Sequence, residues 1–451
     1  MKQISIIILI TISLYSFSQE NLEKYWYYRE RLCKYFVKVG PNAGESIVAE
    51  RLNDLRYDKY KIGDGTIDLA WYISVLATEY ALLSQNNQNT NKTLQELFYA
   101  LKAYERLDLC EDKEPWNKDT AKLDGFFNRE DVELYNTRGA FSLKGRNVEL
   151  SKDSVWGTRA AGKPTYIKEI DKYYSFPIKK SVAMSQDQAV HLLMGFALIV
   201  RSLPNEEVYF KDLENNKLSV NFYVWAQQLT DLIISYIKRE NWVIKDPNAD
   251  NVERGANAFA NAYAFAKAGK YITGKSYQDF LSLEPASVLA WNIQVVPNFP
   301  NQYNTTMAMC LAAIGNSWQF PCGTANNLYL AGSVWRRHYL YVPLFMYLYN
   351  AGVSKPAYNK KIIKKSINDA PKYGTYFWGN KYVNFSCCDS VYGNPGGGWA
   401  YSNKFRSDKK GQDNGVDMAN FNGLDFMLLF NLYQLIEKPY PYVFFKTVEN
   451  Y

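Results

Sequence analysis

The chain has 451 residues, of which 52 are basic and 45 are acidic, so its formal net charge is +7. Because no dense run of Lys or Arg accompanies this mild positive charge, the composition argues against a nucleic-acid-binding protein. The chain has only two histidines, and its six cysteines lack the spacing of a zinc ligand set, so we expect neither a metal site nor a cofactor.

The first 18 residues have the pattern of a secretory signal peptide. Lys2 is followed by an almost wholly apolar stretch from Ile4 to Phe17 and then by polar residues. This stretch is too short to span a bilayer comfortably, and no later apolar run reaches membrane-spanning length. Removal of Lys2 with the signal would reduce the net charge from +7 to +6. We therefore expect a secreted or periplasmic protein without a membrane span, in which residues 19–451 form a single domain.

Several stretches are apolar on nearly every face, which is typical of buried helices. They comprise residues 67–83, 185–201, 257–269, 305–314, 337–349 and 421–435. Amphipathic patterns fall between most of them, at residues 93–109, 221–239, 356–367 and, more weakly, 277–283. A further amphipathic helix at residues 21–38 can pair with the last buried helix. Because every apolar face needs cover, the pattern predicts an all-α fold with six inner helices inside about six outer helices.

This alternation resembles the (α/α)6 toroid of six-hairpin glycosidases and of several toroid polysaccharide lyases. The resemblance covers almost all of the mature chain, but it concerns architecture alone, since no motif assigns one family. It implies a ligand cleft at one end of the inner helices. The outer-to-inner connections at residues 40–66, 110–184 and 370–420 are long, and in a toroid they emerge on one face, beside the N-termini of the inner helices. We therefore expect the functional site on that face.

The buried helix at residues 185–201 carries its polar groups in its first two turns. Ser185 and Gln188 fit a capping box, in which each side chain satisfies a backbone donor of the other. Asp187 and His191 are four residues apart and therefore share a face of the helix. Polar groups gathered at the start of a buried helix indicate a site there. The alternative is that Asp187 caps the helix and that His191 is a hydrogen-bonded core residue.

The predicted loops and helix starts contribute further candidates. Asp68 lies in the first turn of the helix at residues 67–83, and Asp124, Arg129 and Asp131 lie in the connection at residues 110–184. Other candidate substrate-binding residues precede or open the remaining inner helices: Arg254, Asn257, Arg337, His338, Trp399, Tyr401 and Asp417. Each acid has a structural alternative, because acids near a helix start often interact with its dipole and Asp-Gly pairs often form turns.

Glycoside hydrolysis of a polysaccharide or oligosaccharide is the reaction we favour. It needs one carboxyl group that is protonated and one that is ionised. Asp187 suits the ionised role because a helix N-terminus favours negative charge, whereas Asp68 has apolar neighbours that favour its protonated form. Asp124 or Asp131 could take the place of Asp68. The helix starts offer several acids, whereas two histidines leave few bases for elimination.

Two alternatives remain open at this point. A polysaccharide lyase would need a base and a group that neutralises a uronate carboxylate. The candidates for these roles are His191, His338 and Tyr401 as the base, with Arg254, Arg337 and Asn257 at the carboxylate. The mild positive charge suits such an acidic glycan. The other alternative is a glycan-binding or scaffold protein without catalytic activity, since a shared fold does not fix a function. The sequence does not define the oligomeric state.

Overall fold

The computed structural model describes a part of the chain that is mostly helical, which confirms the predicted helical class. The described residues are 20–33, 36–37, 48, 51–52, 60–61, 65–109, 122–129, 132–133, 142–143, 146–147, 164–167, 172–175, 184–248, 256–277, 287, 289, 307–308, 310–312, 314, 341–349, 360–369 and 422–437. The predicted signal peptide, residues 1–18, lies outside them. Among the described residues, no helix has both the length and the apolar character needed to cross a membrane.

The helices coincide with predicted ones, with ends that differ by a few residues. They are α2 (Gly65–Gln85), α3 (Asn91–Leu109), α4 (Gln186–Ser202), α5 (Phe222–Arg239), α6 (Ala256–Thr273), α10 (Tyr341–Leu348), α11 (Lys360–Asp369) and α12 (Leu424–Glu437). Residues 20–33 are also helical and are called the N-terminal helix below. Helical residues at 307–308, 310–312 and 314 fall inside the buried helix predicted at 305–314.

Short antiparallel strands, which the sequence did not predict, accompany the helices. The hairpin of β8 (Val208–Lys211) and β9 (Lys217–Val220) connects α4 to α5 and packs on α3. Phe210 anchors this hairpin against the rings of Phe98 and Phe222. The remaining strands are β1 (Arg51–Leu52) with β2 (Tyr60–Lys61), β4 (Ser142–Leu143) with β5 (Arg146–Asn147), and the sheet of β3 (Val132–Glu133), β7 (Lys172–Ser175) and β6 (Pro164–Ile167) in that order.

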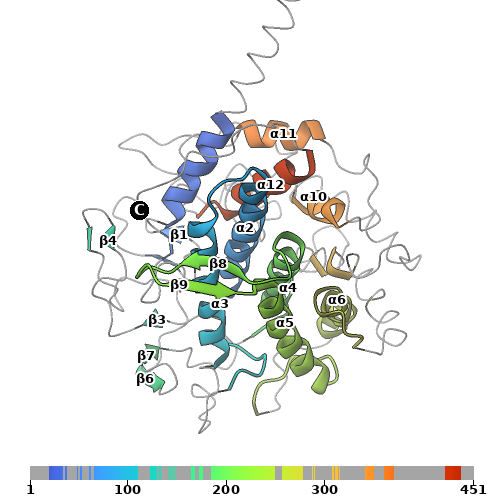
Figure 1. Ribbon diagram of the computed structural model, residues 1–451. Helices are drawn as coiled ribbons and strands as arrows, with labels where there is room; N and C mark the ends of the chain where they lie inside the picture. Colours follow the sequence, from blue (N-terminus) through green and yellow to red (C-terminus); the bar gives the residue numbers. More distant parts are fainter. Residues whose placement is uncertain are drawn as a thin grey trace, which may run out of the picture.

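Five helices pack one against the next in the order α6, α4, α2, α12 and α10 (Figure 1). The contact between α2 and α4 is the most extensive in the described part of the chain. The amphipathic helices lie against this series: α3 packs on α2, α5 on both α4 and α6, and α11 on α12. The apolar stretches that the sequence predicted as buried helices therefore contribute to one continuous core.

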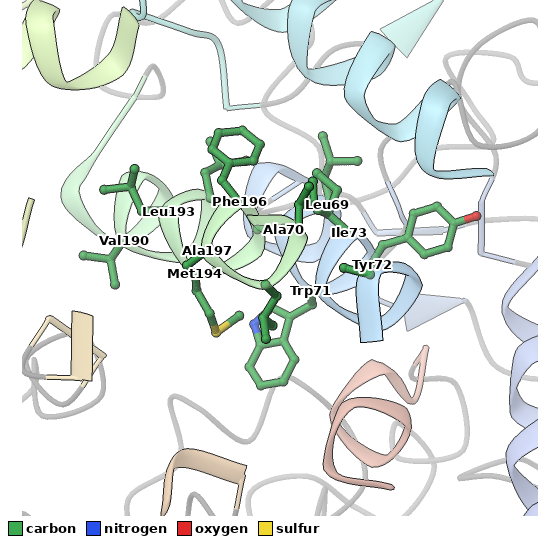
Figure 2. Packing of buried hydrophobic residues seen from close by; sticks show 14 of the residues in the cluster. Leu69, Ala70, Trp71, Tyr72, Ile73, Val190, Leu193, Met194, Phe196 and Ala197 are labelled. Atoms are coloured by element: carbon green, nitrogen blue, oxygen red, sulfur yellow. The ribbon is translucent and has the colours of Figure 1, made fainter. Parts of the chain in front are cut away.

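The helices α2 and α4 are parallel and closely packed. Trp71 of α2 stacks on His191 of α4, with ring centroids 6.3 Å apart. One turn further along α4, a Cβ atom at Gly195 would lie 3.1 Å from the carbonyl oxygen of Ala70 and 3.2 Å from Cγ2 of Ile73. Figure 2 shows the labelled apolar side chains of both helices around this contact. The backbone N–H groups of Thr66, in the first turn of α2, and of Met184, just before α4, bind the carbonyl oxygens of Arg129 and Phe127, so both helices begin at the same end.

The helix α12 runs parallel to α2 on its other side. Asn422, just before α12, donates from Nδ2 to Oδ1 of Asp68 at 2.8 Å, in the first turn of α2. Further along, Asn431 donates to the carbonyl oxygen of Val75 at 3.2 Å and to the hydroxyl of Thr78 at 3.1 Å. The N-terminal ends of α12, α2 and α4 therefore lie at one end of the helix series.

The N-terminal helix packs on α12, as the sequence predicted. The ring of Tyr25 stacks on Phe430 with centroids 5.0 Å apart, and Tyr28 meets Phe426 at 4.6 Å. Asn431 also donates to the hydroxyl of Tyr25 at 3.1 Å. The start and the end of the described chain are thereby joined through buried aromatic and polar contacts.

A buried ionic network ties the N-terminal helix to α2 and α3. Arg29 donates from Nε to Glu79 Oε2 at 2.7 Å, and from Nη2 to Glu79 Oε1 at 3.1 Å and Glu96 Oε2 at 3.0 Å. The side chains of these three residues are at most 5% exposed. Tyr25 and Tyr72 each donate a hydroxyl to one of the two carboxylates. The network holds the three helices together, and its buried charges are tolerated because they are paired and receive further hydrogen bonds.

Replacing Gly195 by valine should lower the free energy of unfolding by about 1–3 kcal/mol, because the added side chain would push α4 away from α2. Urea unfolding followed by circular dichroism measures this loss. Valine at Ser235, an exposed position inside α5, reports the helix-propensity cost of a β-branched residue alone. Equal losses for the two variants would contradict close packing at Gly195.

Candidate functional site

Residues 122–129 connect the N-terminal ends of α2 and α4. The carbonyl oxygen of Arg129 accepts from the backbone N–H of Thr66 in the first turn of α2, at 3.0 Å. The carbonyl oxygen of Phe127 accepts from the backbone N–H of Met184, two residues before α4, at 2.9 Å. This segment belongs to the long connection that the sequence placed on the functional face, and it reaches the predicted helix starts.

The same segment is fixed at its other end by α3 and α5. Asp108, in the last turn of α3, accepts from the backbone N–H groups of Asp124 and Gly125 at 2.9 and 3.1 Å. Burial raises the pKa of Asp108 well above its ordinary value. Gly125 has φ +93°, and a Cβ atom there would lie 2.2 Å from the carbonyl oxygen of Leu232 in α5. Glycine is therefore required at this position by both the backbone conformation and the lack of space.

Asp124, a predicted catalytic candidate, lies in the turn at this fixed end. Its Oδ1 accepts from the backbone N–H of Phe126 at 3.1 Å, and its Oδ2 lies 3.9 Å from a guanidinium nitrogen of Arg239 in α5. These contacts match the turn alternative that the Asp-Gly pair indicated. They place Asp124 beside α5, whereas Arg129, five residues later, reaches α4.

The start of α4 holds Asp187 in a chain of hydrogen bonds. Ser185 is the N-cap, and the predicted capping box forms, with Gln188 Oε1 accepting from the backbone N–H of Ser185 at 3.1 Å. Arg129 donates from Nη2 to Oγ of Ser185 at 3.0 Å, and Oγ of Ser185 donates to Oδ1 of Asp187. The same Oδ1 accepts from the backbone N–H of Gln188 at 3.1 Å. A hydroxyl thus links the Arg129 guanidinium to the Asp187 carboxylate.

His191 is fully buried one turn into α4. Its Nδ1 contacts the backbone carbonyl oxygen of Asp187, not the carboxylate that shares its helix face. A carbonyl oxygen can only accept, so Nδ1 carries the proton, and Nε2 of a neutral ring is the nitrogen that can accept one. The stacked ring of Trp71 joins His191 to α2.

Asp68 lies at the corresponding place on α2. Its side chain is fully buried and accepts the hydrogen bond from Asn422. Trp71 follows Asp68 by three residues and therefore shares its helix face. Asp68 and Asp187 accordingly lie in the first turns of two parallel, adjacent helices, on the outer side of the Trp71–His191 contact.

A further polar pair extends this end of the helix series to α6. Asn261 donates from Nδ2 to Oε1 of Gln186 at 2.6 Å, and both side chains are buried. Since α2, α4 and α12 begin at this end, their dipoles favour negative charge on a carboxylate or on a ligand. The sequence reasoning missed Gln186, Asn261 and Asn422. The available signal was that each of these amide side chains lies beside or within an apolar stretch of the sequence.

Other predicted site residues are not brought into this arrangement by the described structure. Asn257 lies in the first turn of α6, but its side chain is not described. The residues outside the described part of the chain are Asp131, Arg254, Arg337, His338, Trp399, Tyr401 and Asp417. Their predicted roles stay predictions.

Within the described residues, no group of three or more His, Cys, Asp or Glu side chains is arranged to hold a metal ion. Comparison of the chain with protein families, with curated proteins and with solved structures finds no match. The arrangement of side chains at the helix starts therefore carries the functional argument.

Proposed function

We propose that this protein is an exported carbohydrate-active enzyme that hydrolyses glycosidic bonds of a polysaccharide or oligosaccharide. The observation that carries the proposal is the pairing of Asp68 and Asp187 in the first turns of two parallel, neighbouring helices. Glycoside hydrolysis uses two carboxyl groups that face one substrate. Their positions on rigid buried helices suit the fixed geometry that such chemistry requires.

We further propose that the helices form an (α/α)6 toroid. Support comes from the contact order α6, α4, α2, α12 and α10, together with the helical residues between 307 and 314, which fill the position between α6 and α10 in chain order. The N-terminal helix, α3, α5 and α11 take the outer positions (Figure 1). In such a ring, the ends of the inner helices that carry Asp68 and Asp187 border the substrate cleft.

The two carboxyl groups have environments suited to different roles. Asp187 is half-buried at a helix N-terminus, where the dipole interacts favourably with negative charge, and it accepts hydrogen bonds from the Ser185 hydroxyl and from the backbone N–H of Gln188. It is therefore assigned as base or nucleophile. Asp68 is fully buried, which penalises a charge and assigns it as the acid. Asn422 orients this acid through its hydrogen bond.

One observation favours elimination as the second candidate reaction. Nδ1 of His191 is held by a backbone carbonyl, which favours the tautomer in which Nε2 is the proton-accepting nitrogen that a base would use. Arg129 is bound to Ser185 beside the same helix start and has the charge needed to neutralise a uronate carboxylate. A polysaccharide lyase would use these two residues in place of the carboxyl pair.

The products distinguish hydrolysis from elimination. The protein is incubated with neutral and uronate-containing glycans, and new reducing ends and ultraviolet absorbance are measured together. Hydrolysis gives new ends without a chromophore, which is the expected result. New ends with rising absorbance would indicate elimination, because that reaction leaves an unsaturated uronate. The catalytic assignment would then move from Asp68 and Asp187 to His191 and Arg129. Binding without new ends on every glycan would instead favour a non-catalytic glycan-binding protein.

A further inference from the structure

Asn128 carries a buried side-chain amide whose hydrogen-bonding capacity is unfilled. The side chain is fully buried, and within the described structure neither its Nδ2 nor its Oδ1 has a hydrogen-bond partner. Native proteins leave few buried polar groups in this state, because each costs the free energy of a lost hydrogen bond. An amide with both its donor and its acceptor unfilled therefore calls for a functional explanation.

The backbone around Asn128 is fixed on every side. Its own N–H donates to the carbonyl oxygen of Leu107 in α3 at 3.0 Å. The preceding carbonyl binds the backbone of Met184, and the carbonyl of Arg129 binds the backbone of Thr66. Asn128 therefore lies where the end of α3, the start of α2 and the approach to α4 meet.

Two neighbouring elements carry further unfilled polar atoms at this junction. Oγ1 of Thr66 and Nε2 of Gln188 are buried, and neither has a hydrogen-bond partner in the described structure. Thr66 is bonded through its backbone to Arg129, and Gln188 is bonded to Ser185, which in turn accepts from Arg129. Unfilled groups on α2, on α4 and on the connecting segment thus cluster around one arginine.

We propose that Asn128 is a substrate-binding residue that forms hydrogen bonds to two adjacent hydroxyl groups of one sugar ring. This inference rests on the proposed function. An amide presents a donor and an acceptor side by side, and two neighbouring sugar hydroxyls present the complementary pair. Asn128 directly precedes Arg129, which binds Ser185 at the helix start that holds Asp187, so the amide belongs to the segment that borders the proposed cleavage site. Since Asn128 is covered in this structure, the incoming sugar must displace the groups that cover it.

The test compares full-length Asn128→Leu and Thr230→Val with the wild type. Leucine removes the amide at similar size, and Thr230 is the matched control because its buried hydroxyl on α5 is also without a partner in the described structure. The probes are cellohexaose, xylohexaose, and the hexamers of galacturonate and of mannuronate. We expect Asn128→Leu to melt no lower than the wild type while its KM rises about tenfold or more. Thr230→Val should keep the wild-type KM.

An unchanged KM in Asn128→Leu overturns the inference, and a lowered melting temperature alongside it assigns the amide a structural role. If Asn128→Leu folds poorly, Asn128→Asp decides. It keeps the shape and the acceptor but loses the donor, so its KM should also rise, and an unchanged value overturns the inference.

Failure of the proposed function has a different signature. If the wild type cleaves none of the four hexamers, the proposed hydrolysis is rejected, and sugar binding is tested through melting temperature instead. A rise with any hexamer in the wild type and Thr230→Val, but not in Asn128→Leu, supports binding by Asn128. The same rise in all three proteins, or no rise in the wild type, rejects it.

Discussion

Replacing Arg29 by methionine is expected to lower the free energy of unfolding by about 3–5 kcal/mol. The substitution leaves Glu79 and Glu96 buried without their main counter-charge, and a buried carboxylate that loses its cation is far less stable than an exposed one. Methionine keeps the length and packing of the apolar part of the arginine side chain, so the lost free energy of unfolding measures the effect of removing the charge. Urea unfolding of the full chain measures it.

The control for Arg29 is an ion pair at the surface. Lys275 binds Asp231 at 2.6 Å, but its side chain is 61% exposed, so Lys275→Met should change the free energy of unfolding by less than about 1 kcal/mol. Similar losses in the two variants would mean that burial does not set the strength of the Arg29 network.

The same network predicts a dependence of stability on acid. Burial alone raises the pKa of Glu96, but Arg29, Lys92 and the hydrogen bond from Tyr72 outweigh it, so the net pKa is lowered from its ordinary value of 4.5. A carboxyl group with a lowered folded pKa contributes stability above its unfolded pKa and loses it as the pH falls through the folded value. Arg29→Met removes the main cause of this lowering, so the stability that the variant loses relative to the wild type should be largest near neutral pH and should shrink as the pH falls through this range. Urea unfolding of both proteins at several pH values measures the difference.

Replacing Asp187 by asparagine is expected to lower the catalytic rate at least about a hundredfold, because it removes the proposed base or nucleophile. The free energy of unfolding should fall by only about 0.3–1 kcal/mol, from the lost charge at the helix N-terminus. Asparagine keeps an oxygen that can accept from Ser185 and from the backbone of Gln188. Release of new reducing ends and thermal unfolding are measured on the same preparation.

Asp231→Asn is the matched control for Asp187, since it removes a carboxylate from α5, where its partners are Lys275 and Tyr277. It should retain the wild-type rate. If Asp187→Asn keeps nearly full activity, or if it melts far below the wild type, the residue has the capping role that its position in the first turn also allows.

The positions of the helices could be predicted because a fully buried helix leaves a long apolar run in the sequence and a half-buried helix leaves an amphipathic pattern. Residues 67–83 and 185–201 are apolar on nearly all faces, and these segments form α2 and α4 at the centre of the core. The β8–β9 hairpin left no such record. Its strands are short, and Tyr209 and Lys217 face solvent, so its sequence resembles that of an ordinary loop.

The candidate site could be predicted only in part. Asp68, Asp187 and His191 lie in the opening turns of apolar helices, and the structure brings the first turns of those helices together. Their partners could not be inferred, because Asn422 meets Asp68 across 354 residues and that pairing depends on the packing of α12 against α2. Arg129 was proposed from composition, whereas its bond to Ser185 depends on the path of residues 122–129.

The joining of the N-terminal helix and α2 to α12 has a consequence for biosynthesis. Tyr25 and Asn431, which share a buried hydrogen bond, are 406 residues apart. At about 5–20 residues per second, a ribosome needs roughly 20 seconds or more to make the chain between them. Throughout that time the faces of α2 and the N-terminal helix that α12 will cover remain open to water. The unfinished chain therefore exposes apolar surface that favours aggregation until its last described helix emerges.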